Sequence, residues 1–455
     1  MNIIIVGGGV VGINLAEILL QTRHHITIIE QDKSRGEYIS DRFDVSVVNG
    51  IGSDPSILKK AEIDKADILI AVTPSDETNL LVCNFAMQEG VEKRIARIRS
   101  DIYTTLDEIN LEKLGVTHII EPEREMVKSI MQYVELPGVT ETANFQSDNI
   151  YIRGYRITGD MPVANKTLFE IRQIAKNSPL LIVVIVREGK SLPPIGSQTI
   201  LPGDRIVAIM PRDSFAAFRS LLNRKASKLG KIVVSGNTIA AIQLTRSLKP
   251  FCGTIVLADS DLEHSKLAAS ELNGIDVFHG DCTDSEFLQE LYIQNTDFFI
   301  AAGSDSEDNI MACLLAKEEG AKNTIAIRYD TRYAKLFRKM GINHVINPHD
   351  ITLNMIIEKI RKIPIGTYLS LKTADVEIVR CKTDDQSTLI GKPLREHGNV
   401  FEKNIIIGCI IRSDEVIIPG GDTVINEGDE IMVFCNSKYV DLAHSLFDPG
   451  KKLDV

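Results

Sequence analysis

The first 21 residues have the sequence pattern that restricts the fold of this chain most strongly. The segment NIIIVGGGVVGINLAEILLQ has an apolar run over Asn2–Val6, three glycines in the spacing G-x-G-x-x-G, and a helical pattern over Ile13–Gln21. In this motif the first glycine permits a tight turn, the second lets the backbone approach a pyrophosphate, and the third lets the helix pack on the strand. The candidate dinucleotide-binding loop consists of Gly7, Gly8, Gly9, Val10, Val11 and Gly12.

The chain repeats itself over two halves, near 1–225 and 228–455. The segment ADILIAVTPSDETNLLVCNFAMQEG at 66–90 matches TDFFIAAGSDSEDNIMACLLAKEEG at 296–320, and ILPGDRIVAI at 200–209 matches INEGDEIMVF at 425–434. A repeat of this length is a duplicated pair of domains rather than a solenoid. We therefore expect each half to fold separately, with a 1–225 fragment that binds NADH.

Each half begins with apolar runs that alternate with helical patterns. Continuous apolar runs indicate parallel strands buried on both faces, and six of them predict a doubly wound α/β domain of the Rossmann type. A smaller α+β module of two hairpin strands, a helix and a further strand follows. We predict four domains, over 1–137, 138–225, 228–364 and 365–455. The strands expected in the first domain are Ile3–Val6, Ile26–Glu30, Val45–Asn49, Ile68–Thr73, Ile95–Ile98 and His118–Glu121.

Composition excludes several classes of function. The net charge is −11 without a basic stripe, which argues against nucleic-acid binding and so disfavours a redox-sensing transcription factor. The longest apolar runs fall far short of the roughly 20 residues that span a bilayer, and no signal peptide precedes the first strand. We predict a cytoplasmic protein without direct membrane insertion. The seven cysteines form no CxxC pair, so neither disulfides nor a metal site are expected.

Further binding residues are expected where the strands end, because ligands of doubly wound sheets bind outside the carboxyl ends of the strands. Glu30 ends the second strand, 18 residues after Gly12, where an acid holds the adenosine ribose and disfavours a 2′-phosphate; NAD(H) is therefore favoured over NADP(H). Asp32 is an alternative for the same role. The other predicted binding residues are Ile51, Thr73, Pro74 and Arg97, although Arg97 has the alternative reading of a plain edge-strand arginine.

Catalytic patterns are missing from the sequence. The histidines form no HExxH motif and no G-x-S-x-G elbow is present, both of which would indicate hydrolytic chemistry. We therefore predict a binding protein rather than an enzyme, with an NAD-dependent oxidoreductase as the alternative.

Several motifs in order closely resemble the TrkA family, the NAD-binding regulatory subunits of prokaryotic Trk potassium-uptake systems. They are IIIVGGGVVG, NGIGSDPSIL, AVTPSDETN and RIARIRS in the first half, and GDCTDSEFL, DNIMACLLAK and GDEIMVF in the second. The resemblance implies two regulator-of-potassium-conductance units, each a Rossmann domain with a TrkA C-terminal-type domain. It also implies an integral-membrane potassium transporter as partner, a peripheral position on the inner face of the membrane, and a homo-oligomer, a dimer or tetramer.

The second copy departs from the glycine pattern. Ser235, Asn237 and Ala240 are expected at the positions of the three glycines, whereas Asp259 keeps the acid at the end of the second strand. A second dinucleotide site is therefore in doubt. The ribose that Glu30 reads is shared by NAD(H), ATP and ADP, and a small ligand such as AMP could persist at Asp259.

Overall fold

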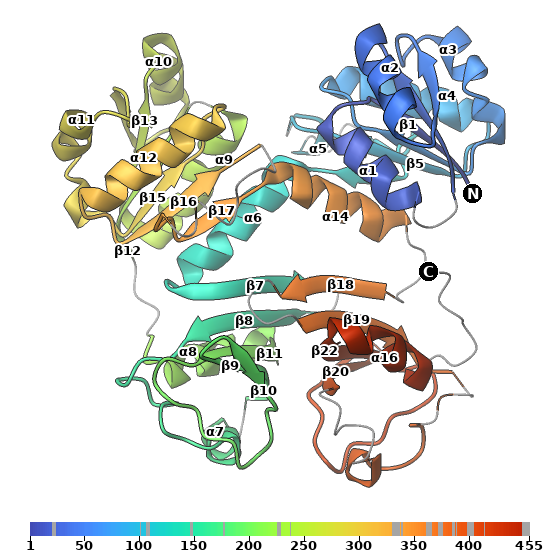
Figure 1. Cartoon of the computed structure of the whole chain (residues 1–455). Helices are drawn as coiled ribbons and strands as arrows, with labels where there is room; N and C mark the ends of the chain where they lie inside the picture. Colours follow the sequence, from blue (N-terminus) through green and yellow to red (C-terminus); the bar gives the residue numbers. More distant parts are fainter. Residues whose placement is uncertain are drawn as a thin grey trace. The chain divides into compact units, whose positions relative to one another are not determined.

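Figure 1 shows the computed structural model of the chain. The structure describes residues 1–20, 24–100, 102–105, 110–145, 149–175, 178–224, 229–236, 238–329, 337, 340–360, 366–371, 376–384, 387, 389–397, 405–413 and 415–447.

The first parallel sheet has six strands in the order β3-β2-β1-β4-β5-β6. Its central strands are apolar and buried, as expected for a sheet with helices on both faces. Val6 at the end of β1 pairs with Ile29 and with Ala71, which brings the carboxyl ends of three strands to one edge. The strands are β1 (Asn2–Val6), β2 (His25–Glu30), β3 (Ser46–Asn49), β4 (Ile68–Ala71), β5 (Lys93–Arg97) and β6 (His118–Ile120).

The helices of this domain begin at the capping residues that the sequence indicates. Asp54 accepts the Ser56 N–H before a proline at the first helical position, and Ser75 caps the helix that follows β4. The first helix begins at Val10, three residues earlier than predicted. The helices are α1 (Val10–Leu20), α2 (Lys33–Arg42), α3 (Pro55–Lys60), η1 (Ile63–Lys65), α4 (Asp76–Gln88), α5 (Ile102–Thr105) and α6 (Pro122–Glu135).

The second parallel sheet repeats this order as β14-β13-β12-β15-β16-β17. The doubly wound fold predicted for both halves is thus confirmed. Its strands are β12 (Leu229–Ser235), β13 (Cys252–Asp259), β14 (Asp276–His279), β15 (Phe298–Ala301), β16 (Asn323–Ile327) and β17 (His344–Ile346). Its helices are α9 (Ile239–Leu248), η4 (Lys249–Phe251), α10 (Leu262–Glu271), α11 (Ser285–Glu290), η5 (Ile293–Asn295), α12 (Ser306–Glu318) and α14 (Pro348–Ile360).

The small modules form two five-stranded sheets, β10-β9-β11-β8-β7 and β18-β19-β22-β20-β21, with antiparallel pairs throughout. The first contains β7 (Val139–Phe145), β8 (Ile150–Arg156), β9 (Leu181–Arg187), β10 (Lys190–Leu192), β11 (Arg205–Pro211), α7 (Leu168–Ile174), η3 (Arg212–Ser214) and α8 (Phe215–Leu221). The second contains β18 (Gly366–Leu371), β19 (Val376–Lys382), β20 (Ile406–Arg412), β21 (Glu415–Ile417), β22 (Glu430–Asn436), η6 (Leu394–His397), η7 (Ser437–Tyr439) and α16 (Val440–Phe447).

Both small modules contain the same buried ion pair. Arg187 donates through two guanidinium nitrogens to the carboxylate of Asp204, at 2.8 Å each, and Asp204 also accepts the Leu201 N–H at 2.8 Å. Arg412 and Asp429 repeat the arrangement at 2.8 and 2.7 Å. The aspartates of the "PGD" and "EGD" motifs therefore tie the turn before the last strand to the end of the hairpin.

The chain forms two compact units, one from residues 1–131 and 228–362 and the other from 132–227 and 363–454. Each unit combines equivalent parts of the two repeats, and the four domain boundaries predicted from the sequence stay predictions. In the second unit the two sheets share an apolar cluster that includes Ile152, Val184, Ile378 and Phe434.

In the first unit a helix of the second repeat completes the core of the first. Leu353, Ile356 and Ile360 of α14 belong to the same apolar cluster as Val11 and Leu15 of α1, and Figure 1 shows α14 beside α1. Lys93 at the start of β5 adds a hydrogen bond to the carbonyl of Lys359, at 2.7 Å. The expectation that each half folds separately does not fit this arrangement, because a 1–225 fragment lacks α14.

Candidate functional site

Two glycines of the first turn are required by the backbone itself. Gly7 has φ +110°, and its N–H donates to the carbonyl of Ile29 at 2.9 Å. Residues with a side chain rarely adopt this backbone conformation, which glycine reaches without strain. A Cβ on Gly12 would lie 2.0 Å from the carbonyl oxygen of Gly7, so the turn and the helix can approach each other only with glycine there.

Gly9 is different, because a Cβ there would have no atom within 4 Å. Its carbonyl accepts the N–H of Ile13 at 3.0 Å, which makes Gly9 the N-cap residue of α1. A glycine has no side chain to cap the helix. Among the described residues, none accepts a hydrogen bond from the N–H groups of Val10, Val11 or Gly12. The first turn of α1 is thus an open set of donors at the positive end of a helix, which suits an anion.

Glu30 lies at the edge of this turn, where the second strand ends. Its side chain is only 4% exposed; Oε2 accepts the Gly8 N–H at 2.8 Å and Oε1 accepts the Asp32 N–H at 2.9 Å. A Cβ on Gly8 would lie 2.9 Å from Oε2, so the second glycine of the run makes room for this carboxylate. A carboxylate has about four acceptor positions. Besides these two N–H groups, Oε2 has the Arg35 guanidinium at 3.8 Å, and the positions left over can accept a ligand's hydroxyls.

Asp32, the alternative acid, is engaged elsewhere. It is the N-cap of α2, and its carboxylate accepts the Arg35 N–H at 2.9 Å. A side chain that caps a helix contributes about 1 kcal/mol to stability. The geometry therefore favours Glu30 as the ribose-binding acid.

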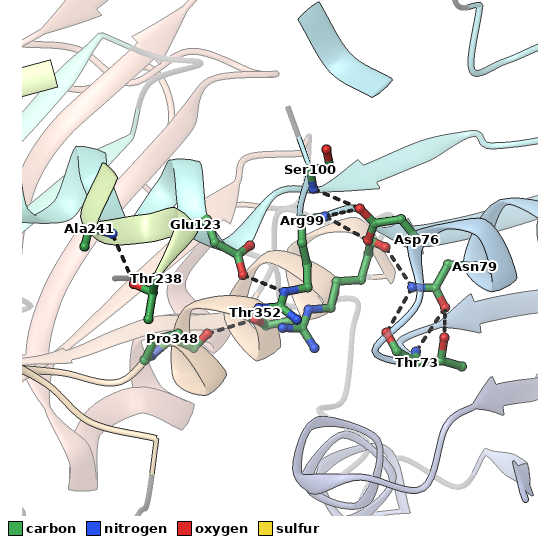
Figure 2. A network of polar contacts seen from close by, with 11 residues as sticks. Thr73, Asp76, Asn79, Arg99, Ser100, Glu123, Thr238, Ala241, Pro348 and Thr352 are labelled. Carbon is green, nitrogen blue, oxygen red and sulfur yellow. Dashed lines mark hydrogen bonds and ion pairs between the residues drawn. The ribbon is translucent and has the colours of Figure 1, made fainter. Parts of the chain in front are cut away.

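Thr73 and Arg97 are brought together by a buried asparagine. Asn79 is fully buried, and its amide oxygen accepts hydrogen bonds from the N–H of Thr73 at 3.0 Å and from the Thr73 hydroxyl at 2.7 Å. The amide nitrogen of Asn79 donates to the carbonyls of Thr73 (3.1 Å) and Arg97 (2.8 Å). Figure 2 shows this contact between Asn79 and Thr73. Asn309 makes three of these four bonds in the second repeat, to the N–H and carbonyl of Gly303 and to the carbonyl of Ile327. Sequence analysis assigned Asn79 no role, although its recurrence at Asn309 was a usable signal.

Ile51 and Pro74 lie at the same edge and face solvent. Ile51 is 60% exposed and follows Gly50, whose N–H donates to the carbonyl of Glu30 at 2.9 Å. Pro74 is exposed beside Thr73. The residues predicted from the sequence thus follow the carboxyl edge of β1, β2, β3, β4 and β5.

The guanidinium of Arg97 is in a polar cluster beyond this edge. Its Nε is buried without a hydrogen-bond partner, and burial lowers the pKa of Arg97, an effect that the nearby Glu123 carboxylate opposes. Glu123 accepts a hydrogen bond from Arg99 at 3.0 Å, and Asp76 accepts the N–H groups of Arg99 and Ser100 (Figure 2). Arg97 therefore has an unused donor within this cluster, and the plain edge-strand reading leaves that donor unexplained.

The structure corrects the alignment of the two turns by one residue. Gly236, with φ +119°, donates its N–H to the carbonyl of Ala258 at 2.9 Å, the contact that Gly7 makes with Ile29. The first glycine is therefore kept in the second repeat as Gly236, and Thr238 and Ala241 occupy the positions of Gly9 and Gly12. The prediction that Ser235 and Ala240 replace glycines was wrong, and the third predicted position, Asn237, lies outside the described residues.

The comparisons with known proteins agree with this fold. Residues 3–122 and 232–348 match the model of the TrkA-N domain, and residues 152–223 and 378–448 match that of the TrkA-C domain. The Trk system potassium uptake protein TrkA of Azorhizobium caulinodans is 29% identical over 453 residues, with 98% of both chains covered. The protein of the same name in Haemophilus influenzae is also 29% identical, with 99% of both chains covered.

Solved structures with the same fold include the GsuK RCK domain, with a TM-score of 0.62 and 18% identity over 98% of this chain and 95% of that one. The GsuK channel bound to NAD has a TM-score of 0.62 and 19% identity, and the match covers 98% of this chain and 78% of that one. Across the described ranges, no helix is long and apolar enough to cross a membrane, and no cluster of three potential metal ligands occurs. Because TrkA-N and TrkA-C domains alternate twice over most of its length, the protein belongs to the TrkA family.

Proposed function

We propose that this protein is a regulatory subunit of a potassium-uptake system that binds NAD(H) in its first parallel-sheet domain. The observation that carries the proposal is the open first turn of α1 next to Glu30. The relatives that match over full length are named for potassium uptake, and a fold neighbour is described as bound to NAD. The protein acts by binding rather than by turnover.

In the proposed complex the dinucleotide lies along the edge described above. Its pyrophosphate lies over Gly9, where no side chain fills the space, and accepts the free N–H groups of α1. The hydroxyls of the adenosine ribose donate hydrogen bonds to Glu30, whose negative charge disfavours the extra phosphate of NADP(H). ATP and ADP share this ribose and compete for the same position. The side chains that border the rest of the ligand are Ile51, Thr73, Pro74 and Arg97.

The partner is a separate integral-membrane potassium transporter, and the protein lies at the cytoplasmic face of the membrane through that partner. The nucleotide acts as a ligand that binds one conformation of a homo-oligomer, a dimer or tetramer, more tightly than another. Only such a difference in affinity shifts a conformational equilibrium.

Calorimetric titration of the full chain with NADH tests the site. Gly9→Val places a side chain where the pyrophosphate lies, and we expect at least about a hundredfold weaker binding, which corresponds to about 2.7 kcal/mol. Gly196→Val is the matched control, because Gly196 is an exposed glycine whose Cβ would also meet no atom within 4 Å. Equal NADH affinity of the two variants contradicts the proposed site.

Reconstitution with the membrane subunit tests the regulatory role. Potassium flux into vesicles should depend on NADH with the unmodified chain and not with Gly9→Val. If NADH is instead consumed when small substrates are added, the protein is an oxidoreductase and the proposal is wrong.

A further inference from the structure

The turn of the second repeat contains a buried carboxylate oxygen without a partner. Asp259, at the end of β13, is 5% exposed; Oδ1 accepts the Asp261 N–H at 2.7 Å, whereas Oδ2 is buried with no hydrogen bond. At the equivalent position both oxygens of Glu30 accept N–H groups. Aspartate is one methylene shorter than glutamate, and Oδ2 of Asp259 has no counterpart of the bond that Glu30 accepts from Gly8. An unsatisfied buried acceptor is unfavourable, so Oδ2 is available to a ligand that donates a hydrogen bond.

Thr238 fills the place that a phosphate would need. Its hydroxyl accepts the Ala241 N–H at 3.1 Å and donates to the carbonyl of Ala302 at 2.7 Å, which caps the ten-residue helix α9. Gly9, at the corresponding position of α1, leaves open space and free N–H groups. A phosphate at α9 would have to displace the threonine and both of its hydrogen bonds. The second turn therefore lacks the anion site of the first.

The charges around Asp259 also disfavour an anion. Asp261 lies close enough to act on the charge of Asp259, and Asp281 occupies the position of the apolar Ile51. The residues near Asp259 that carry a positive charge only when protonated are His264, on α10, and His279, at the end of β14. Burial raises the pKa of Asp259, in keeping with an acid whose surroundings do not compensate its charge.

We propose that the second repeat contains a binding site for an uncharged ligand with vicinal hydroxyls, a nucleoside without phosphates, whose hydroxyls donate to Asp259. Thr238 is the residue that determines specificity, because it occupies the phosphate position. This site is separate from the proposed NAD(H) site of the first repeat and takes a different chemical class of ligand.

The test uses adenosine as the probe and the full chain with both Gly9→Val and Glu30→Gln, which remove the phosphate space and the ribose acceptor of the first site. We expect adenosine to bind at least about tenfold more tightly than ADP. Asp259→Asn should remove adenosine binding. With Asp259 in place, 2′,3′-dideoxyadenosine should bind no more tightly than adenosine binds to the Asp259→Asn variant. Asp276→Asn in the same background is the matched control and should leave adenosine binding unchanged, because Asp276 is exposed at the start of β14, at the opposite edge of the sheet from Asp259.

Thr238→Gly tests the specificity residue. We expect it to increase ADP affinity by about tenfold or more while adenosine affinity stays the same, and the conservative Thr238→Ser should keep ADP excluded because serine also caps helices. Circular dichroism confirms that each variant is folded. The proposal is overturned if adenosine does not bind, if Asp259→Asn leaves its affinity unchanged, or if ADP binds as well as adenosine with Thr238 in place.

Discussion

Replacing Asp204 by alanine should destabilise the first small module far more than removal of an exposed ion pair elsewhere in the chain. The Asp204 side chain is 1% exposed and accepts three hydrogen bonds, two from Arg187 and one from the Leu201 N–H. Asp204→Ala leaves the Leu201 N–H unpaired, at a cost of about 1–3 kcal/mol. Arg187 is 29% exposed and keeps its bond to the carbonyl of Thr199, so water solvates part of its charge.

The two contributions together give an expected loss of about 2–4 kcal/mol, near the lower end of the range for breaking a buried pair. Native-state hydrogen exchange measures it as faster exchange of the amides of β8, β9 and β11, because local opening reports the stability of the module that contains them. Asp429→Ala should cause the same loss in β19, β20 and β22, since its carboxylate makes equivalent bonds.

The matched control is Asp422→Ala. Asp422 pairs with Arg395, but the two side chains are 84% and 65% exposed, and exposed pairs contribute little because water screens them. We expect no measurable change in exchange for this variant. If Asp204→Ala and Asp422→Ala had equal effects, the reasoning from burial and hydrogen-bond satisfaction would be refuted.

Three further variants test the turns and the edge of the sheets. Gly12→Ala should lower the free energy of unfolding by about 1–3 kcal/mol, measured by denaturant titration, because its Cβ would lie 2.0 Å from the Gly7 carbonyl oxygen; an unchanged midpoint would show that α1 moves away freely. Asn79→Ala should lower the free energy of unfolding by about 2–4 kcal/mol and weaken NADH binding, since Thr73 loses the two hydrogen bonds that it donates to Asn79. Unchanged NADH affinity in calorimetry would show that Thr73 is not part of the site. Asp259→Asn without ligand should raise the melting temperature at pH 7. Burial raises the pKa of Asp259 above the reference 3.8, so the folded chain loses stability as pH rises from 3.8 through that raised pKa. The uncharged amide of asparagine avoids this loss. Identical melting temperatures of the two proteins at every pH would contradict the prediction.

The sequence predicted the parallel sheets well, because strands such as β1 and β4 are short apolar runs bounded by clear turns. It also placed Glu30 correctly at the edge, since the acid follows the glycine motif at a regular distance. The alignment of the second turn failed by one residue. Ser235, Gly236 and Asn237 are all small, so composition alone does not fix which of them takes the turn; the pairing of Ser235 with Ala258 does.

The role of α14 could not be read from its sequence for a different reason. The apolar positions Leu353, Ile356 and Ile360 predict a helix with a buried face, but amphipathic spacing carries no information about which helix covers that face. Asn79 was missed because its bond to the carbonyl of Arg97 depends on the approach of β4 and β5 in space, although its recurrence at Asn309 was a signal in the sequence.

The position of α14 against α1 has a consequence for how the protein is made. The apolar face of α1 is synthesised within the first 20 residues, but the helix that covers it emerges from the ribosome only after residue 360. Domains generally fold in order during synthesis, yet here the core that contains α1 is completed only by α14. At about 5–20 residues per second, the interval lasts many seconds. During this time the part of α1 that meets α14 lacks its cover, although Val11 and Leu15 also belong to a cluster with Ile3 and Ile5 of the first sheet. We expect chaperones that act on nascent chains to bind this segment during translation. If the gene is split between the two repeats, we expect active protein only when both products are made together.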